Sequence, residues 1–275
     1  MDLPLWDGLS LRIHDPPVGA DQYATSRLQR GLLLLRLGED MAEEAVGFGV
    51  PVLKRGLQTI FPGRVALDAS RLGSGWRLNA RFRLDRVEKI SKDGHRYLEG
   101  AWLYAVKNLL AALMRHWPVA RSPLTAASSR LRHLFGWQTT YAEAGYAAQV
   151  AVTYDLQPPA RQLGMQVELS SLPPDVTEAV IMNEQGAHHF DRYRDSSGLS
   201  LQGSKIGCWD AVRAGEAWFE SRAAGVAFGL HQVQGARLFR GRELIGSRLA
   251  WAGFGYSFAP AMKQLRYELT ITGPA

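Results

Sequence analysis

The nine residues RLNARFRLD, at positions 77–85, predict a β-strand more clearly than any other stretch of this sequence. The even positions from 78 to 84 hold Leu, Ala, Phe and Leu, and the odd positions hold polar residues. This alternation gives an extended chain one apolar and one polar face. The turn signal LGSG at 72–75 precedes the stretch, and residues 59–67 before the turn also favour an extended chain. Together these runs predict a β-hairpin.

Further strand signals follow along the chain, either as alternation or as β-branched and aromatic content. They occur at 150–156, 165–169, 179–182, 217–219, 225–230, 249–258 and 265–271. Gly and Pro separate these runs, and most connections are short enough for antiparallel pairing. Strands and helices do not alternate as they would in a parallel sheet. The sequence therefore predicts a mainly β fold, a large antiparallel sandwich or barrel, in a single domain over residues 1–275.

One segment departs from this pattern and predicts a helical insertion around 97–135. Its main helix is expected at 102–117, where Pro118 ends the pattern. The apolar stripe of this helix comprises Trp102, Val106, Leu109, Leu113 and Trp117. Packing of the stripe on the sheet is the favoured interpretation. A lid over a ligand cavity and an interfacial contact with a membrane through 102–135 are the alternatives.

The charge of the chain is concentrated in the same region. The formal net charge is +6, yet no Asp or Glu occurs between positions 100 and 142. That stretch holds five basic residues, Lys107, Arg115, Arg121, Arg130 and Arg132. The asymmetry indicates either a solvated basic face or contact with a phosphate, a carboxylate ligand or an anionic surface.

Several classes of protein and site are disfavoured. Cys208 is the single cysteine, which excludes an intrachain disulfide and any zinc site with two thiolate ligands. The sequence contains no Gly-x-Ser-x-Gly elbow, Walker loop or His-Glu-x-x-His motif. We therefore expect no cofactor and no metal. Basic and aromatic residues are not interleaved as in stacking platforms, so no nucleic-acid partner is expected. The N-terminus does not resemble a signal peptide, and we expect a cytoplasmic protein.

The densest polar cluster is NEQGAHHFDRYRD, at 183–195, which we interpret as a loop leaving a short strand. Histidine exchanges protons near neutral pH, and a carboxylate can orient it or act as its counterpart. The candidate catalytic residues are His188 or His189 as the acid and Glu184 or Asp191 as its partner. A structural role for these histidines, as hydrogen-bonding loop residues, is the competing interpretation.

A second cluster supplies candidate substrate-binding residues. Arg240 and Arg242 share one face of a strand and are expected to clamp a carboxylate or phosphate. Glu243 and Trp251 lie close by in the sequence, and aromatic side chains beside polar groups suit a sugar ring or an apolar ligand. The first cluster adds Arg192 and Tyr193 to these candidates.

Three features together resemble the galactose mutarotase-like β-sandwich proteins. They are the run VTYDL at 152–156, the alternating strand after it, and the segment from Asn183 to His188 and His189. The resemblance implies an antiparallel supersandwich and a carbohydrate-active enzyme. It further implies His188 or His189 as the acid and a glutamate as the base.

The leading functional hypothesis is a cofactor-independent enzyme that acts on a sugar or related polar small molecule by general acid/base chemistry. Epimerase-, lyase- and hydrolase-like reactions all fit this hypothesis. The first alternative is a lipocalin-like binding protein or isomerase for an apolar ligand, with helix 102–117 as its lid. The second alternative is a non-enzymatic interaction module that docks through its basic helices.

Overall fold

The computed structural model describes most of the chain, and the predicted runs lie in strands except for Gly225, which belongs to the turn before β15. It describes residues 2–6, 9–13, 33–37, 47–56, 58–92, 96–98, 109, 113, 117, 134, 136–157, 161–245 and 249–273. Residues 77–85 lie in one long strand, and the turn at 72–75 joins it to the strand before. The predicted hairpin is therefore confirmed.

The strands come in the following order, with a short 3-10 helix η2 at Gly203–Ile206. They are β1 (Asp2–Trp6), β2 (Leu9–Ile13), β3 (Leu33–Leu37), β4 (Gly47–Arg55), β5 (Gln58–Leu72), β6 (Gly75–Lys92), β7 (Arg96–Leu98), β8 (Trp137–Leu156), β9 (Gln162–Ser171), β10 (Glu178–Gly186), β11 (Arg192–Asp195), β12 (Ser200–Gln202), β13 (Cys208–Ala211), β14 (Glu216–Ser221), β15 (Val226–His231), β16 (Ala236–Ile245), β17 (Leu249–Phe258) and β18 (Gln264–Thr272).

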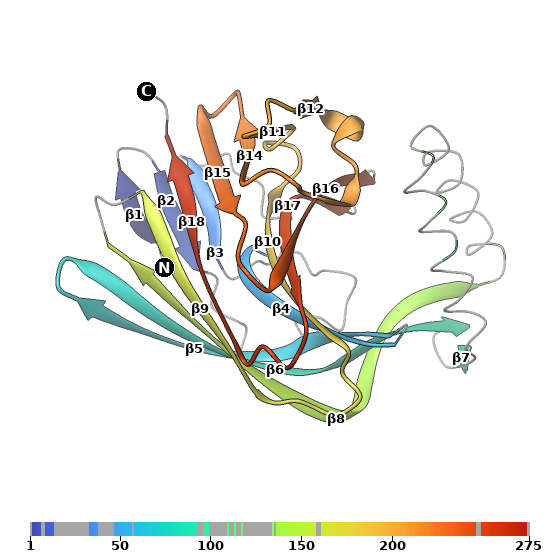
Figure 1. The fold of residues 1–275 in the computed structure, drawn as a ribbon. Coiled ribbons are helices and arrows are strands. Elements are labelled where there is room, and N and C mark those ends of the chain that lie inside the picture. The colour runs from blue at the N-terminus through green and yellow to red at the C-terminus, as the bar shows by residue number, and fades with distance from the viewer. Residues whose placement is uncertain are drawn as a thin grey trace.

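A single large sheet forms the body of the molecule, and a small sheet β1-β2-β3 accompanies it (Figure 1). The large sheet has the order β12-β11-β14-β15-β18-β9-β8-β6-β5-β4-β10-β17-β16-β13, and β7 pairs with β6. The pairings we observe in both sheets are antiparallel, from β1–β2 to β8–β9. The predicted mainly β, antiparallel architecture is therefore confirmed.

The large sheet folds over so that its two halves face each other as a sandwich (Figure 1). Phe48 on β4 contacts Phe228 on β15, with ring centroids 5.3 Å apart. Phe254 on β17 lies 4.8 Å from Phe219 on β14 by the same measure. These rings are fully buried. Packed rings thus lie between β4, β14, β15 and β17 in the core of the sandwich.

Hydrogen bonds also join the two halves through the core. The Tyr267 hydroxyl on β18 donates to Oδ1 of Asn183 on β10 over 3.0 Å. The Tyr154 hydroxyl on β8 donates to the carbonyl of Phe48 over 3.0 Å. At one end, the amide of Leu35 on β3 donates to Oε1 of Gln185 over 2.9 Å, which attaches the small sheet. Burying a polar group costs free energy unless it is hydrogen-bonded, and these groups are.

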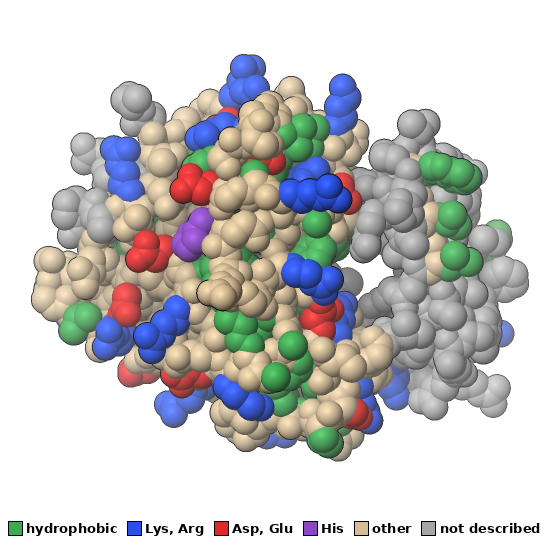
Figure 2. Space-filling view, in the orientation of Figure 1, with side chains coloured by type: hydrophobic (Ala, Val, Ile, Leu, Met, Phe, Trp, Pro, Cys, Tyr) green, Lys and Arg blue, Asp and Glu red, His purple; other side chains and the backbone are tan. Residues whose placement is uncertain are grey.

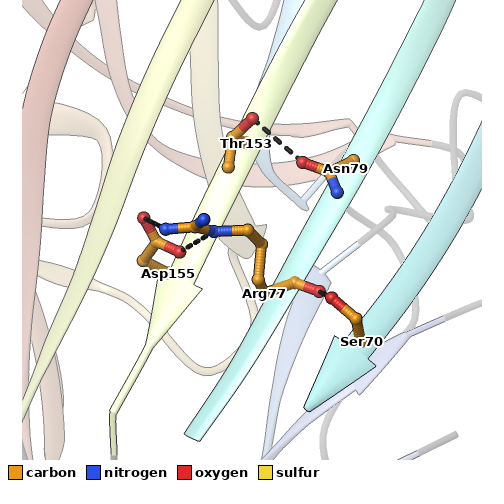
Figure 3. Close-up of polar contacts among 5 residues, drawn as sticks. All are labelled: Ser70, Arg77, Asn79, Thr153 and Asp155. Carbon is orange, nitrogen blue, oxygen red and sulfur yellow. Dashed lines mark hydrogen bonds and ion pairs between the residues drawn. The ribbon is translucent and has the colours of Figure 1, made fainter. Parts of the chain in front are cut away.

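The alternation that buries one face of β6 leaves a polar ladder on the other (Figure 3). Arg77 on β6 forms an ion pair with Asp155 on β8, with Nε 2.6 Å from Oδ1. One step further along the same pair of strands, the Thr153 hydroxyl donates to Oδ1 of Asn79 over 3.1 Å. These contacts are partly exposed, so they tie neighbouring strands together but contribute little stability.

Part of the predicted helical insertion is described, and it does not pack as expected. Tyr97 and Leu98 belong to β7, so the first two residues of the predicted insertion lie in a strand. Leu109 and Leu113 have helical backbone, and the Trp117 amide donates to the Leu113 carbonyl over 2.9 Å. All three side chains are exposed. The prediction that this stripe packs on the sheet is therefore wrong for these residues. The rest of the 99–135 segment, apart from Leu134, lies outside the described residues.

The described helical residues give no indication of a transmembrane helix. Within the part of the chain that the structure describes, no helix has both the length and the apolar content needed to cross a bilayer.

Candidate functional site

Strand β10 separates its polar side chains between the two faces of the sheet. Successive side chains of a strand point to opposite faces. Asn183 is paired with Phe254 on β17, whose ring lies in the core, and therefore faces inward. Glu184 follows it and faces outward. The sequence had indicated a loop that starts at residue 183. The strand instead continues to Gly186, so residues 183–186 belong to β10.

Glycines surround Glu184 on the outer face. Its cross-strand partners are Gly47 on β4 and Gly253 on β17, and Gly253 is paired in turn with Gly241 on β16. A Cβ atom added to Gly253 would collide with the carbonyl oxygen of Asn183 and the Cα of Glu184. Gly47, Glu184, Gly253 and Gly241 thus form a row across four strands, in which Glu184 carries the single side chain and the glycines expose backbone. We call this row of glycines the glycine floor.

Two tryptophans lie over neighbouring parts of this floor. A Cβ atom at Gly241 would lie only 2.6 Å from Cη2 of Trp251, and one at Gly255 only 2.6 Å from Cζ3 of Trp209. The two indole rings stack, with centroids 5.0 Å apart and planes 25° apart. Glycine at positions 241 and 255 is thus what allows both rings to lie against the sheet.

The backbone of Trp209 is held in an unusual conformation. Its φ is 60°, in the left-handed region that costs a non-glycine residue roughly 1–2 kcal/mol. Strain of this kind persists only where the surrounding structure imposes it, and it is concentrated at functional sites. Here it turns the ring of Trp209 from the edge strand β13 back over Gly255.

The electrostatics of Glu184 set it apart from the other described carboxylates. The side chain is buried, and its Oε1 atom has no hydrogen-bond partner among the described residues. Burial, with a smaller contribution from the negative charge of Glu243, raises the pKa of the Glu184 carboxyl to about 8. Glu243, on the same outer face of β16, accepts a hydrogen bond at Oε2 from Nε1 of Trp251 over 3.3 Å. We refer to Glu184, Trp209, Glu243 and Trp251 with their glycine floor as the outer site.

Arg240 and Arg242 share a face of β16, as predicted, but it is the face opposite to Glu243. The guanidinium of Arg242 donates to the carbonyls of Ala187, over 2.8 Å, and Phe190, over 3.3 Å. Arg240 donates to the Ile206 carbonyl over 3.1 Å. The two arginines therefore hold main-chain carbonyls in neighbouring loops, and the structure does not bring them to the outer site.

The arginines also explain the path of the chain after β10. Arg242 holds the turn that contains His188, which is exposed, and His189, which is half-buried. Backbone amides of that turn return to the Gly186 carbonyl. The histidines thus lie in a fixed turn at the end of the strand that carries Glu184, and not on a strand themselves.

The remaining candidates of the first cluster lie on or beside β11. Tyr193 is fully buried in the core, and its hydroxyl donates to Oδ2 of Asp195 over 2.8 Å. Asp191 accepts at Oδ2 from Nε2 of Gln202 over 3.2 Å. Arg192 is half-buried on the strand. The structure brings none of these three to the outer site.

Sequence reasoning thus identified three members of the outer site and missed Trp209 and the glycines. The alternation of Gly253 and Gly255 in the run WAGFGYSF was the available signal, because paired small residues on one face of a strand allow a ring to lie flat. Within the described ranges, no group of three or more His, Cys, Asp or Glu residues is arranged to hold a metal ion.

Comparison with known proteins shows a fold and no family. No protein-family model matches the chain, and no curated protein matches it in sequence. Its structure is similar to that of α-N-acetylgalactosaminidase NagBb from Bifidobacterium bifidum in complex with GalNAc, with a TM-score of 0.50 and 10% identity. The chain is covered over 100% of its length and spans 36% of that enzyme chain. A quadruple mutant of the same enzyme gives a TM-score of 0.48, again at 10% identity over 100% and 36% of the two chains. At this identity the similarity concerns the β-rich fold alone.

Proposed function

We propose that this protein is an enzyme that acts on a cyclic sugar by general acid/base chemistry at the outer site. The observation that carries the proposal is the Glu184 carboxyl. It is buried, its Oε1 has no hydrogen-bond partner in the part of the chain that the structure describes, and its pKa is about 8 beside a second glutamate. Pairs of titratable groups whose surroundings separate their pKa values commonly divide the roles of acid and base.

The raised pKa assigns the roles. At pH 7 the Glu184 carboxyl is protonated and can donate its proton to an acetal oxygen of the sugar. Glu243 then accepts the proton released from the sugar hydroxyl or from an attacking water. Ring opening and glycosidic-bond cleavage both begin with the first of these transfers, so the same pair serves an epimerase-like or a hydrolase-like reaction.

The tryptophan pair supplies a binding surface of the right kind. The faces of sugar rings carry C–H groups that pack on aromatic rings, while their hydroxyls need polar partners at the edge. Trp209 and Trp251 are stacked beside Glu243, and Trp209 is partly exposed. The galactose mutarotase-like resemblance in the sequence and the fold shared with an N-acetylgalactosaminidase support a carbohydrate as the substrate.

His188 and His189 give a competing assignment of the acid. They lie in the turn directly after β10, two or three residues beyond Gly186. The two assignments separate by mutation: loss of activity in His188→Ala or His189→Ala, with activity retained in Glu184→Gln, would favour the histidines.

The proposal is tested with two probes. Polarimetry follows the mutarotation of α-D-galactose, and absorbance follows the release of nitrophenol from 4-nitrophenyl N-acetyl-α-galactosaminide. We expect Glu184→Gln to lower the rate constant of the active reaction by about 10²–10⁴-fold, the usual contribution of a positioned proton donor. Glu216→Gln, an exposed glutamate on β14, is the matched control and should retain full activity.

Two results would contradict the proposal. One is full activity of Glu184→Gln and Glu243→Gln on a sugar that the wild type turns over. The other is no turnover of either probe together with no quenching of tryptophan fluorescence by galactose or N-acetylgalactosamine.

A further inference from the structure

The second half of strand β5 forms an edge of the large sheet. β4 pairs with β5 only through residues 58–60 of β5, whereas β6 continues beside β5 as far as Leu72. From Arg64 to Leu72, no described residue outside β6 makes a main-chain hydrogen bond with β5. Figure 1 shows this hairpin reaching out from the body of the molecule. We call residues 64–72 the open edge, because such an edge offers unpaired N–H and C=O groups to another strand.

The inner face of the open edge carries apolar side chains that are incompletely covered. Val65 and Leu67 lie on this face and pack against the core. Both are only half-buried, and Ala69 on the same face is exposed. A further strand with apolar residues at matching positions would cover this margin of the core.

The outer face of the open edge carries two charged side chains that form no ion pair with a described residue. Arg64 is paired across the strands with Arg83, and like charges in directly opposite positions repel. Arg83 has its own partner in Asp85, with Nε 2.7 Å from Oδ2. Asp68, four residues beyond Arg64, lies beside the uncharged Asn79. Figure 2 shows both acidic and basic side chains along the lower left of the molecule, where the hairpin lies.

A second copy of this chain provides a strand that fits both faces. Two copies related by a twofold axis pair their edges in antiparallel order, with one residue opposite the same residue of the other copy. If that residue is Leu67, Val65 lies opposite Ala69 of the second copy, so the inner face is apolar throughout. On the outer face, Arg64 then lies diagonally across from Asp68 of the second copy, within reach of a long side chain. A register centred on Asp68 would instead bring two carboxylates together.

We propose that the open edge pairs with the open edge of a second copy, centred on Leu67, to form a symmetric dimer. The large sheet then continues from one copy into the other through β5. Few residues of each strand take part, so the interface is small, and we expect a weak dimer with a dissociation constant in the micromolar range. The interface contains no residue of the outer site and does not depend on the proposed enzyme activity.

Sedimentation velocity of the full chain, over a wide range of protein concentration, measures the dimer directly. Leu67→Lys places two like charges at the centre of the interface and should raise the dissociation constant at least about tenfold. Leu199→Lys, at a leucine that is 40% exposed just before β12, is the matched control and should leave the dissociation constant unchanged. Circular dichroism spectra and unfolding midpoints verify that each variant is folded.

A charge exchange tests the contact on the outer face. Arg64→Asp and Asp68→Arg each bring like charges together across the interface, and each should weaken the dimer about tenfold. The variant that combines both changes restores opposite charges, so we expect its dissociation constant to return to that of the wild type. Within one copy the two positions lie about 13 Å apart along the strand, so a rescue of this kind requires a contact between copies.

A single introduced cysteine tests the register. In a Cys208→Ser background, Leu67→Cys brings two thiols together at the twofold axis, where opposite Cβ atoms are about 4.5–5.5 Å apart. Mild oxidation should therefore yield a covalent dimer. Ser70→Cys on the same strand is the control, because the two copies of position 70 lie about 20 Å apart in this register.

Four outcomes would overturn the proposal. They are a monomer at every concentration, a dimer that Leu67→Lys leaves intact, single charge changes that the combined variant does not rescue, and cross-linking through Ser70→Cys in place of Leu67→Cys. None of these outcomes depends on turnover of a sugar, so failure of the dimer and failure of the proposed function are observed separately.

Discussion

The two faces of β10 treat neighbouring polar residues in opposite ways. On the inner face, Asn183 accepts hydrogen bonds from the Gly49 amide and the Tyr267 hydroxyl, both over 3.0 Å. On the outer face, Glu184 is equally buried, yet no described residue forms a hydrogen bond with its Oε1. A buried group with all its partners stabilises one packing, while a buried group without them remains available for chemistry. The inner face of this strand thus carries a hydrogen-bonded core residue, and its outer face carries a candidate reaction site.

The largest expected effect concerns the outer face and the pH dependence of stability. The Glu184 pKa is about 8 in the folded chain and 4.5 for an ordinary glutamate, so the folded state binds the proton more tightly. The stabilisation from this protonated carboxyl is fully present below pH 4.5 and is lost as pH rises to about 8. Its loss amounts to about 5 kcal/mol, at about 1.4 kcal/mol per pH unit.

Urea unfolding of the wild type and Glu184→Gln between pH 4 and pH 9 measures this effect. The variant cannot ionise at this position, so we expect it to lack this part of the pH dependence and to be the more stable protein at pH 8. Glu216→Gln should follow the wild type, because Glu216 is exposed. Identical pH profiles for the wild type and Glu184→Gln would show that the two faces of β10 do not differ as described.

A second prediction concerns close packing on the inner face. Gly49 has a φ of 76°, and a Cβ atom there would lie 2.7 Å from the Tyr154 hydroxyl. Gly49→Ala should therefore lower the free energy of unfolding by about 3 kcal/mol, from left-handed backbone strain and overpacking together. Gly56→Ala is the control: its φ is 56°, but no atom lies within 4 Å of the added Cβ, so about 1 kcal/mol is expected. Equal losses of unfolding free energy in the two variants would show that close packing against Tyr154 does not add to the cost at position 49.

The smallest predicted effect tests whether Asn183 is held by its partners. Tyr267→Phe removes one donor to Asn183, while the Gly49 amide still donates to the same oxygen. We expect a loss of about 1 kcal/mol in the free energy of unfolding. A double-mutant cycle with Asn183→Ala should give a coupling of similar size. Strict additivity of the two changes would mean that this hydrogen bond does not link the halves of the sheet.

The sequence alone predicted about half of the strands and one pairing, the β5–β6 hairpin, but not the strand order. Alternation is a local property with a period of two. The apolar positions within 77–85 therefore predict which side chains of β6 are buried, and these side chains are buried in the structure. The confirmed hairpin, the antiparallel pairing and the mainly β class all follow from such local patterns and from short connections. Glu184, Glu243 and Trp251 were also singled out from sequence, as chemically capable residues near strand ends.

Only the tertiary structure decided which of these residues meet. Glu184 and Glu243 lie 59 positions apart in the sequence, and their nearness depends on β17 pairing with both β10 and β16. The sequence placed Arg240 and Arg242 with them, but strand alternation puts both arginines on the opposite face. It also expected Leu109, Leu113 and Trp117 to be covered, since helical periodicity identifies an apolar face without stating what lies against it. Burial and contact depend on residues distant in the chain, and local patterns carry no information about those residues.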